Sequence, residues 1–290
     1  MSVIRAIREK LGVVDPATVL PFLPCNSGQT GYFSYLVSQP RPIPAGSSII
    51  SVFNAKHSPS LDAAHKSSVD FKLGYYFSLL HSRVQNDWFG LPRYPDPAEP
   101  SYSWQESFTE FIESAIEKID SSGAIDSVAL PFTEIRRLLS IAIGSFLFDD
   151  VEVPALVTFS GTENDILAIV AENNSASAVD VVFPPGSVFS CAVWGDPLME
   201  ALFTPPGPSD VFMQGYRGDS SPDAFPARTQ VKLLWYTLYR ALLGYHHSAS
   251  CGKQSEAVPW AEKIRECVAE LQTRLSVDNP WSLLLSLKPT

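Results

Sequence analysis

The sequence has few cysteines and lacks any long uninterrupted apolar run. Its four cysteines, Cys25, Cys191, Cys251 and Cys267, are far apart within 290 residues and form no C-x-x-C pair. This spacing indicates neither a zinc site nor a dense disulfide framework, so we expect reduced thiols. No apolar stretch approaches the ~20 residues that a membrane-spanning helix needs.

Positive charge is also scarce. There are 21 Lys and Arg residues against 31 Asp and Glu, which gives a formal net charge of -10. This balance opposes binding to nucleic acid or to an anionic membrane, so neither is an expected partner. The first residues, MSVIRAIREKLGVVD, place charges among apolar side chains and lack the apolar core of a secretory signal. We therefore expect a cytoplasmic protein whose partner is a small molecule or another protein, a second copy included.

Apolar residues make up 45% of the chain, enough to bury a sizeable core. The first ~60 residues are rich in Pro, Gly and Ser, and the short runs GYFSYLV and SSIISVF are typical of strands. These features predict a small β-rich lobe over residues 1–68. The run VDFKLGYYFSLLHSRV then places Phe71, Tyr75, Leu79 and Val84 roughly at helical spacing, which predicts a buried helix.

Helical patterns dominate the rest of the chain, residues 69–290. The segment SWQESFTEFIESAIEKIDSSG carries its apolar residues on one face and predicts an amphipathic helix that ends near Gly123. A second helical run follows, and then four short β-rich runs, ALVTF, DILAIV, AVDVVF and SVFSCAV, that we expect to form hairpins. Two further helical runs complete the order. The pattern predicts an α+β protein rather than an alternating βαβ chain.

The order of several motifs resembles the aminoglycoside phosphotransferase and fructosamine kinase superfamily, whose members have a bilobal fold like that of protein kinases. The matching pieces are LGYYFSLLHS, then ALVTFSGTENDILAIV, and then the most specific piece, AVWGDPLMEALF, followed by VFMQGY. The resemblance implies a reduced β-rich N-terminal lobe and a mainly helical C-terminal lobe.

The same resemblance implies that the phosphate-transfer residues have been replaced. In the family one Asp orients the acceptor hydroxyl, and an Asn and a second Asp hold Mg²⁺. Here Ser160 stands at the catalytic Asp, Asp165 at the Asn and Val188 at the metal-binding Asp. Serine accepts no proton near neutral pH, and valine offers a cation no ligand. Two such losses lower turnover by a factor of about 10⁴ or more if they act separately.

The phosphate-gripping lysine of the family also has no direct counterpart. In the strand SIISVFNAK, Ser51 falls at the position of that lysine, and Lys56 lies nearby but shifted. The segment between this strand and the following helix is short. The resemblance therefore implies a reduced nucleotide cleft.

These observations predict a protein that does not transfer phosphate and that uses no cofactor and no metal. We expect it to bind a small organic metabolite in the old acceptor cleft, with Trp235, Tyr236 and Tyr239 as its aromatic wall. One hypothesis is a nucleotide-independent enzyme of secondary-metabolite biosynthesis, a cyclase, isomerase or dehydratase. Its catalytic residues would then be Ser160, Glu163 and Asp165.

Two alternatives remain open at the level of sequence. The chain could be a regulatory or scaffolding pseudokinase. It could also be an ATP-dependent small-molecule kinase whose carboxylates have moved, with Glu163, Asp165 and Asp180 as metal ligands in place of the family's own. Asp196, in the GDP motif, is expected to fix its loop rather than to act in catalysis.

Overall fold

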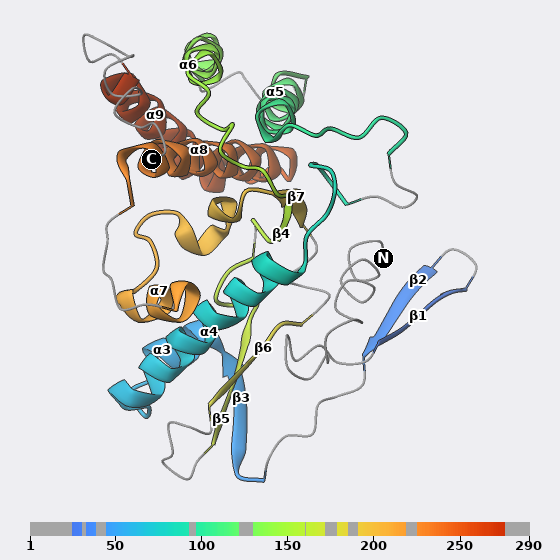
Figure 1. Ribbon diagram of the computed structural model, residues 1–290, viewed down its shortest axis with the longest axis vertical. Coiled ribbons are helices and arrows are strands. Elements are labelled where there is room, and N and C mark those ends of the chain that lie inside the picture. The colour runs from blue at the N-terminus through green and yellow to red at the C-terminus, as the bar shows by residue number, and fades with distance from the viewer. Residues whose placement is uncertain are drawn as a thin grey trace.

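The computed structural model describes most of the C-terminal four-fifths of the chain. It covers residues 45–92, 97–121, 130–159, 161–171, 179–184, 191–218 and 225–275, and the backbone of the antiparallel hairpin formed by β1 (Cys25–Thr30) and β2 (Phe33–Ser38). The fold is α+β, as the sequence predicts, with helices dominating the C-terminal part (Figure 1). Within the described residues, no helix is at once long enough and apolar enough to cross a membrane.

A three-stranded antiparallel sheet lies at one end of the molecule. Its strands are β3 (Ser47–Ser51), β5 (Leu167–Ala171) and β6 (Asp180–Val182), in the order β3-β5-β6. Ile49 of β3 pairs with Ile169 of β5, so a strand from the predicted N-terminal lobe hydrogen-bonds to one from the predicted C-terminal lobe. The division at residue 68 stays a prediction.

Two helices follow β3 and pack beside this sheet. The short α3 (Val52–His57) begins where the Ser51 hydroxyl accepts the amide N–H of Asn54. The long α4 (Ala63–Arg83) begins at Asp62, whose carboxylate accepts the amide N–H of His65 and caps the first turn. Ser51 thus serves as a helix cap at the position where the family places a lysine.

The buried face of α4 differs from the predicted one. Val69, Leu73 and Phe77 are buried, whereas Phe71 and Tyr75 are 42% and 45% exposed. The apolar residues of this helix lie on more than one side and alternate with polar ones, so spacing alone did not identify which side faces the core.

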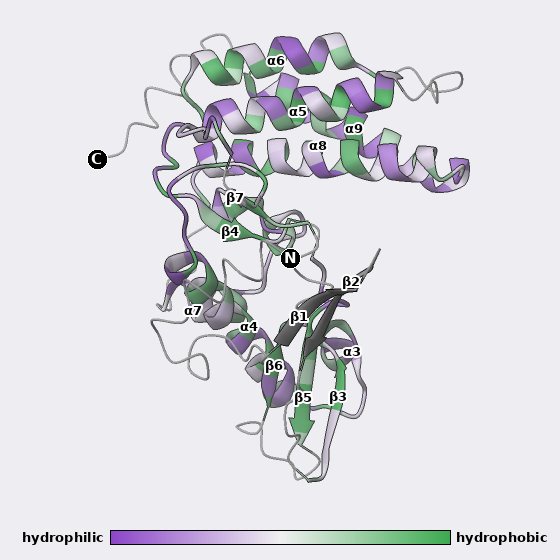
Figure 2. Cartoon of the chain, turned by 90° about the vertical axis from the view of Figure 1, so that its right-hand side faces the viewer, coloured by the Kyte–Doolittle hydropathy of each residue, from purple (hydrophilic) through white to green (hydrophobic). Residues whose placement is uncertain are grey.

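Four helices form the opposite end of the molecule, α5 (Trp104–Ser121), α6 (Phe132–Gly144), α8 (Ala227–Ser250) and α9 (Gln254–Leu275) (Figure 2). The predicted amphipathic helix is confirmed as α5, which buries the apolar face that runs from Trp104 to Ile119. The helices enclose one large hydrophobic cluster.

A two-stranded ribbon lies between the two ends, built from β4 (Ala155–Val157) and β7 (Val193–Gly195) (Figure 1). Successive side chains of each strand point to opposite faces of the ribbon, as strand geometry requires. Val157 and Val193 enter the cluster of the four helices, whereas Leu156 and Trp194 enter a second cluster around α4 and the three-stranded sheet. The ribbon therefore belongs to both cores.

Two short 3₁₀ turns, η2 (Pro197–Met199) and η3 (Ala201–Phe203), lead from β7 to α7 (Asp210–Arg217). Helices α4 and α7 cross at glycines. A Cβ atom on Gly74 of α4 would overlap the carbonyl oxygen of Phe212, and one on Gly215 of α7 would overlap that of Phe71. The two backbones are in contact, which fixes the position of α7 against α4.

Candidate functional site

The loop from Thr158 to Ile166, between β4 and β5, holds the residues that the sequence predicts to be catalytic. Thr158 is buried, and its amide N–H and hydroxyl donate to the two carboxylate oxygens of Glu200 at 2.7 and 2.8 Å. Ser160, the predicted catalytic serine, lies outside the described residues, as does Val188. Glu163 and Asp165 lie within them.

Glu200 anchors the start of this loop in a buried polar network. Nε2 of His81, from α4, lies 3.2 Å from a Glu200 oxygen. Nδ1 of the same ring lies 2.8 Å from the hydroxyl of Tyr216. Burial and the negative charge of Glu200 raise the pKa of Tyr216, so this hydroxyl stays protonated and has a hydrogen to donate. The network ties the loop to α4 and α7.

Asp196, in the GDP motif, fixes a second network, as expected. Its carboxylate accepts the amide N–H of Leu198 at 2.9 Å and the hydroxyl of Tyr236 at 2.6 Å. The ammonium of Lys232 lies 2.6 Å from the same carboxylate, and both side chains are almost fully buried. These contacts hold α8 against the turn that follows β7.

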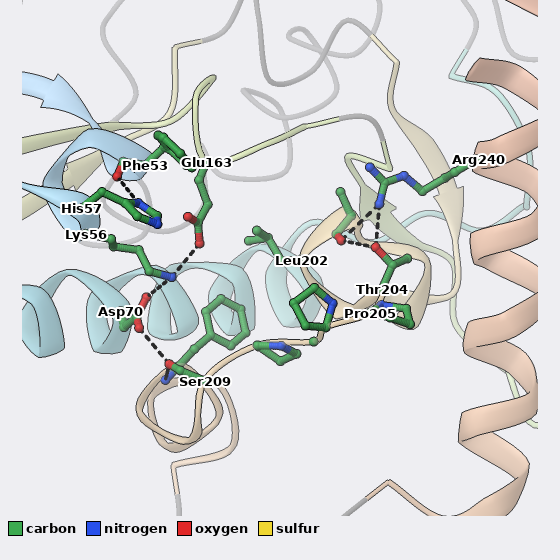
Figure 3. Close-up of a pocket in the computed structure, with 15 residues that line it drawn as sticks. Phe53, Lys56, His57, Asp70, Glu163, Leu202, Thr204, Pro205, Ser209 and Arg240 are labelled. Carbon is green, nitrogen blue, oxygen red and sulfur yellow. Dashed lines mark hydrogen bonds and ion pairs between the residues drawn. The ribbon is translucent and has the colours of Figure 1, made fainter. Parts of the chain in front are cut away.

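Glu163 belongs to an ion cluster that the sequence did not predict. Its carboxylate lies 2.6 Å from the ammonium of Lys56 on α3, and that ammonium also lies 2.8 Å from Asp70 on α4 (Figure 3). Asp70 accepts a further hydrogen bond of 2.8 Å from the hydroxyl of Ser209, the N-cap of α7. Four separate segments therefore converge on one group of charges.

The environment of Lys56 favours its charged form. Burial alone would lower the pKa of Lys56, but hydrogen bonds and attraction from Asp70 and Glu163 outweigh it and raise the pKa above its ordinary 10.5. Lys56 remains an ammonium under physiological conditions.

The other two acidic candidates accept hydrogen bonds from nearby groups. Asp165 accepts the amide N–H of Thr162 at 2.9 Å and its hydroxyl at 2.7 Å, which closes a turn within the loop. Asp180 accepts the hydroxyl of Tyr76 at 2.9 Å. Across the part of the chain that the structure describes, no three His, Cys, Asp or Glu side chains gather as a metal site.

A pocket of about 590 Å³ opens beside the ion cluster. Its walls come from α3, α4, Glu163, the segment 201–209, Phe212 of α7 and Arg240 of α8. Figure 3 shows Lys56, Asp70 and Glu163 on one side of the view and Arg240 with Thr204 on the other. This volume lies within the ~300–1,000 Å³ typical of small-molecule sites.

Arg240 stands at its end of the pocket, and no carboxylate of the described residues forms an ion pair with it. Its Nη1 donates to the Thr204 hydroxyl at 2.6 Å and to the carbonyl oxygen of Ala201 at 3.2 Å, and both acceptors are neutral. Burial lowers the pKa of Arg240, and the charge of Glu200 partly offsets this. A guanidinium nevertheless stays protonated in proteins.

The predicted aromatic wall lies elsewhere. Trp235 and Tyr236 have no exposed surface, and Tyr239 is 6% exposed; all three pack in the cluster of the four helices. The described pocket is lined from the same helix by Arg240 instead. A ligand-binding role for the three aromatic residues stays a prediction.

The residues that sequence reasoning missed are Asp70, Ser209 and Arg240. Asp70 lies within the run that is predicted to be a buried helix, and Ser209 follows a proline-rich turn. Neither position carries a motif, and their roles depend on which segments meet in space. The resemblance points to Lys56 only as a displaced counterpart of a phosphate-binding lysine, not as a partner of Asp70 and Glu163.

Comparison with known proteins identifies the fold. No protein-family model matches the sequence, and no curated protein matches it. The structure is similar to a ligand-free thermostable mutant of the aminoglycoside phosphotransferase APH(4)-Ia, with a TM-score of 0.58 and 15% identity over 91% of this chain and 83% of that one. A mutant of the same enzyme in complex with ADP and hygromycin B gives a TM-score of 0.56 and 16% identity over 87% of this chain and 78% of that one. The kinase-like fold that the motifs imply is confirmed.

Proposed function

We propose that this protein binds a small organic metabolite in the pocket beside Glu163 and does not transfer phosphate from ATP. The proposal rests on one observation, which is that the acidic side chains near the loop already pair with or accept hydrogen bonds from other protein groups. Glu163 pairs with Lys56, Asp165 closes its own turn and Asp180 accepts the Tyr76 hydroxyl. These are the carboxylates that a relocated metal site would need.

Phosphoryl transfer depends on charge neutralisation by metal ions and on a carboxylate that positions the acceptor. Mg²⁺ takes oxygen ligands, normally one or two carboxylates. Removing Glu163 from Lys56 to bind a metal would leave that ammonium half-buried with a single partner, Asp70. The fold of a phosphotransferase does not supply its chemistry, because function depends on the residues of the site.

Glu163 is the predicted catalytic residue that faces the pocket. If the protein is an enzyme, its chemistry is a nucleotide-independent cyclisation, isomerisation or dehydration in which Glu163 moves a proton. Lys56 would hold that carboxylate in place at the wall of the pocket, where it could act as a general base. Asp165 supports this role indirectly, because it shapes the turn that carries Glu163.

Thermal unfolding in the presence of ATP and Mg²⁺ tests the proposal. A ligand at 100 times its dissociation constant stabilises a protein by about 2.7 kcal/mol, which is readily seen as a rise in Tm. We expect no rise with millimolar ATP and Mg²⁺.

Any Mg²⁺-dependent rise would contradict the proposal, and a rise that is lost in Glu163→Gln but kept in Glu117→Gln would assign the metal to Glu163. Glu117 lies on the exposed face of α5 and carries the same chemical change away from the pocket. That outcome would identify a kinase with a relocated metal site, and ADP release with candidate acceptors would follow.

A further inference from the structure

We propose that the ligand of this pocket is a zwitterion, with a carboxylate bound by Arg240, an amine facing Glu163 and Asp70, and an apolar body between them. The inference rests on the proposed function and specifies its ligand class. It rests on the charged side chains along the pocket. Positive charge is in excess at the Arg240 end, and negative charge is in excess at the end with Glu163 and Asp70.

The end at Arg240 has an excess of positive charge. No carboxylate of the described residues lies within ion-pair distance of this guanidinium, and its two observed acceptors are neutral oxygens. Glu200 acts on it electrostatically, but the oxygens of Glu200 are bound by Thr158 and His81. Partly buried cations in proteins are normally paired, and the planar fork of arginine matches a carboxylate.

The opposite end has an excess of negative charge. One ammonium, that of Lys56, stands between two carboxylates, Asp70 and Glu163. The Glu163 side chain is 21% exposed and lines the pocket, so it remains within reach of a ligand. A ligand amine beside Lys56 would supply the second positive charge and, like Lys56, donate hydrogen bonds to the carboxylates.

Apolar side chains separate the two ends. Leu202 and Pro205 lie between Arg240 and the ion cluster in Figure 3, and Phe53 and Phe212 also line the pocket. Such walls favour an aliphatic or aromatic body over a sugar, whose hydroxyl groups would need polar partners there.

A carboxylate fits the Arg240 end better than a phosphate does. The described pocket contains one other lysine or arginine, Lys56, and it is already shared by two carboxylates. A single guanidinium balances a singly charged carboxylate, whereas a phosphate or a nucleotide brings more negative charge than this end can neutralise.

Three probes of matched size test the charge pattern. They are 4-(aminomethyl)benzoate, which carries both charges, 4-methylbenzoate, which keeps the carboxylate, and 4-methylbenzylamine, which keeps the amine. Titration of each into the full-length protein, followed by calorimetry and ligand-observed NMR, gives the affinities. We expect the zwitterion to bind about tenfold more tightly than either half-probe.

Variants at each end separate the two contacts. Arg240→Met keeps the apolar stem and should weaken both carboxylate-bearing probes about tenfold, with the amine probe unchanged. Glu163→Gln should weaken the two amine-bearing probes and leave 4-methylbenzoate unchanged. Arg228→Met is the matched control, because Arg228 is on the same helix but pairs with Asp150 outside the pocket. Its affinities should equal those of the unmodified protein.

Several results would overturn the inference. In the first, the carboxylate probes bind Arg240→Met as tightly as they bind the unmodified protein. In the second, the amine probe binds more tightly than the zwitterion. In the third, no probe binds at millimolar concentration. Arg240→Lys, which keeps the charge, distinguishes loss of a contact from loss of fold and should retain part of the affinity. The ATP and Mg²⁺ experiment tests the proposed function independently of the ligand class. Stabilisation by ATP and Mg²⁺ would contradict the proposed function, whatever affinities the three probes have.

Discussion

At the scale of single residues, the site depends on Lys56. The resemblance assigned this region of the sequence to a phosphate-binding lysine, and Lys56 lay outside the expected position. In the structure its ammonium joins Asp70 and Glu163, which lie on a helix and a loop far apart in sequence. The loop that carries Glu163 could be located because it contains a recognisable motif, and the catalytic role of Glu163 stays a prediction. Its partner could not be predicted, because local patterns carry no information about which distant segments meet.

Replacing Lys56 by Met should destabilise the fold at neutral pH by about 1–2 kcal/mol, because two partly buried carboxylates lose their shared cation. The pairing raises the pKa of Lys56 above 10.5 in the folded state. The contribution of Lys56 is therefore complete below pH 10.5 and is lost as the pH rises through the higher folded-state value. Urea unfolding at a series of pH values measures the difference from the unmodified protein.

Lys253→Met is the control for this experiment. Lys253 forms an exposed pair with Glu256 on the surface, where such pairs contribute little. A Lys56→Met variant that is as stable as Lys253→Met at pH 7 would show that the ion cluster adds nothing to stability.

At the scale of elements, the presence of a helix or strand was easier to predict than the pairing of strands or the buried face of a helix. The amphipathic α5 was predicted from its apolar face, and the strands β4, β5 and β6 from short β-rich runs. The expected pairing of consecutive runs is confirmed for β5 and β6, whereas the pairing of β4 with β7 and of β5 with β3 was not predicted. The orientation of α4 was wrong, because Phe71 and Tyr75 are apolar and yet face outward.

The α4–α7 crossing should not tolerate a side chain. Gly74→Ala would place a methyl group against the carbonyl of Phe212, so we expect a loss of about 2 kcal/mol or more in the free energy of unfolding. Because Phe212 and Ser209 line the pocket, the affinity for the zwitterionic probe should fall as well.

Gly144→Ala provides the contrast within the same chain. Nothing lies within 4 Å of a Cβ atom added to Gly144, which is the last residue of α6. Alanine there should be neutral or stabilise the protein by about 0.5–1 kcal/mol. Equal stability of the two variants would contradict the close contact of α4 with α7.

At the scale of the whole molecule, the order of motifs was enough to predict the kinase-like fold, which the structural comparison confirms. The pocket could not be predicted in the same way, because its lining comes from segments far apart in the sequence. The roles predicted for Ser160 and Val188 stay predictions, because both lie outside the described residues. The β4–β7 ribbon joins the two hydrophobic clusters, and Leu198 packs against both. The two ends of the molecule should therefore unfold together.

Leu156→Ala tests this coupling. Leu156 has no exposed surface and its truncation should cost about 2–5 kcal/mol. The side chain enters only the cluster around α4, yet we expect the whole protein to unfold in a single transition at a lower denaturant concentration. Far-UV and near-UV circular dichroism, followed in the same denaturant titration, should then give the same midpoint. Two separated transitions would show that the four-helix cluster remains folded when the other is lost.

The glycine crossing of α4 and α7 also has a consequence for how this protein could acquire a new ligand. Because the two backbones are in contact, α4 and α7 hold Asp70 and Phe212 at fixed positions in one wall of the pocket, and neither helix can shift to widen or narrow it. The segment 201–209 and the ends at Arg240 and Glu163 carry side chains that can be replaced without moving a helix. Divergence in ligand preference is therefore expected to accumulate in those positions, while the crossing keeps its two glycines.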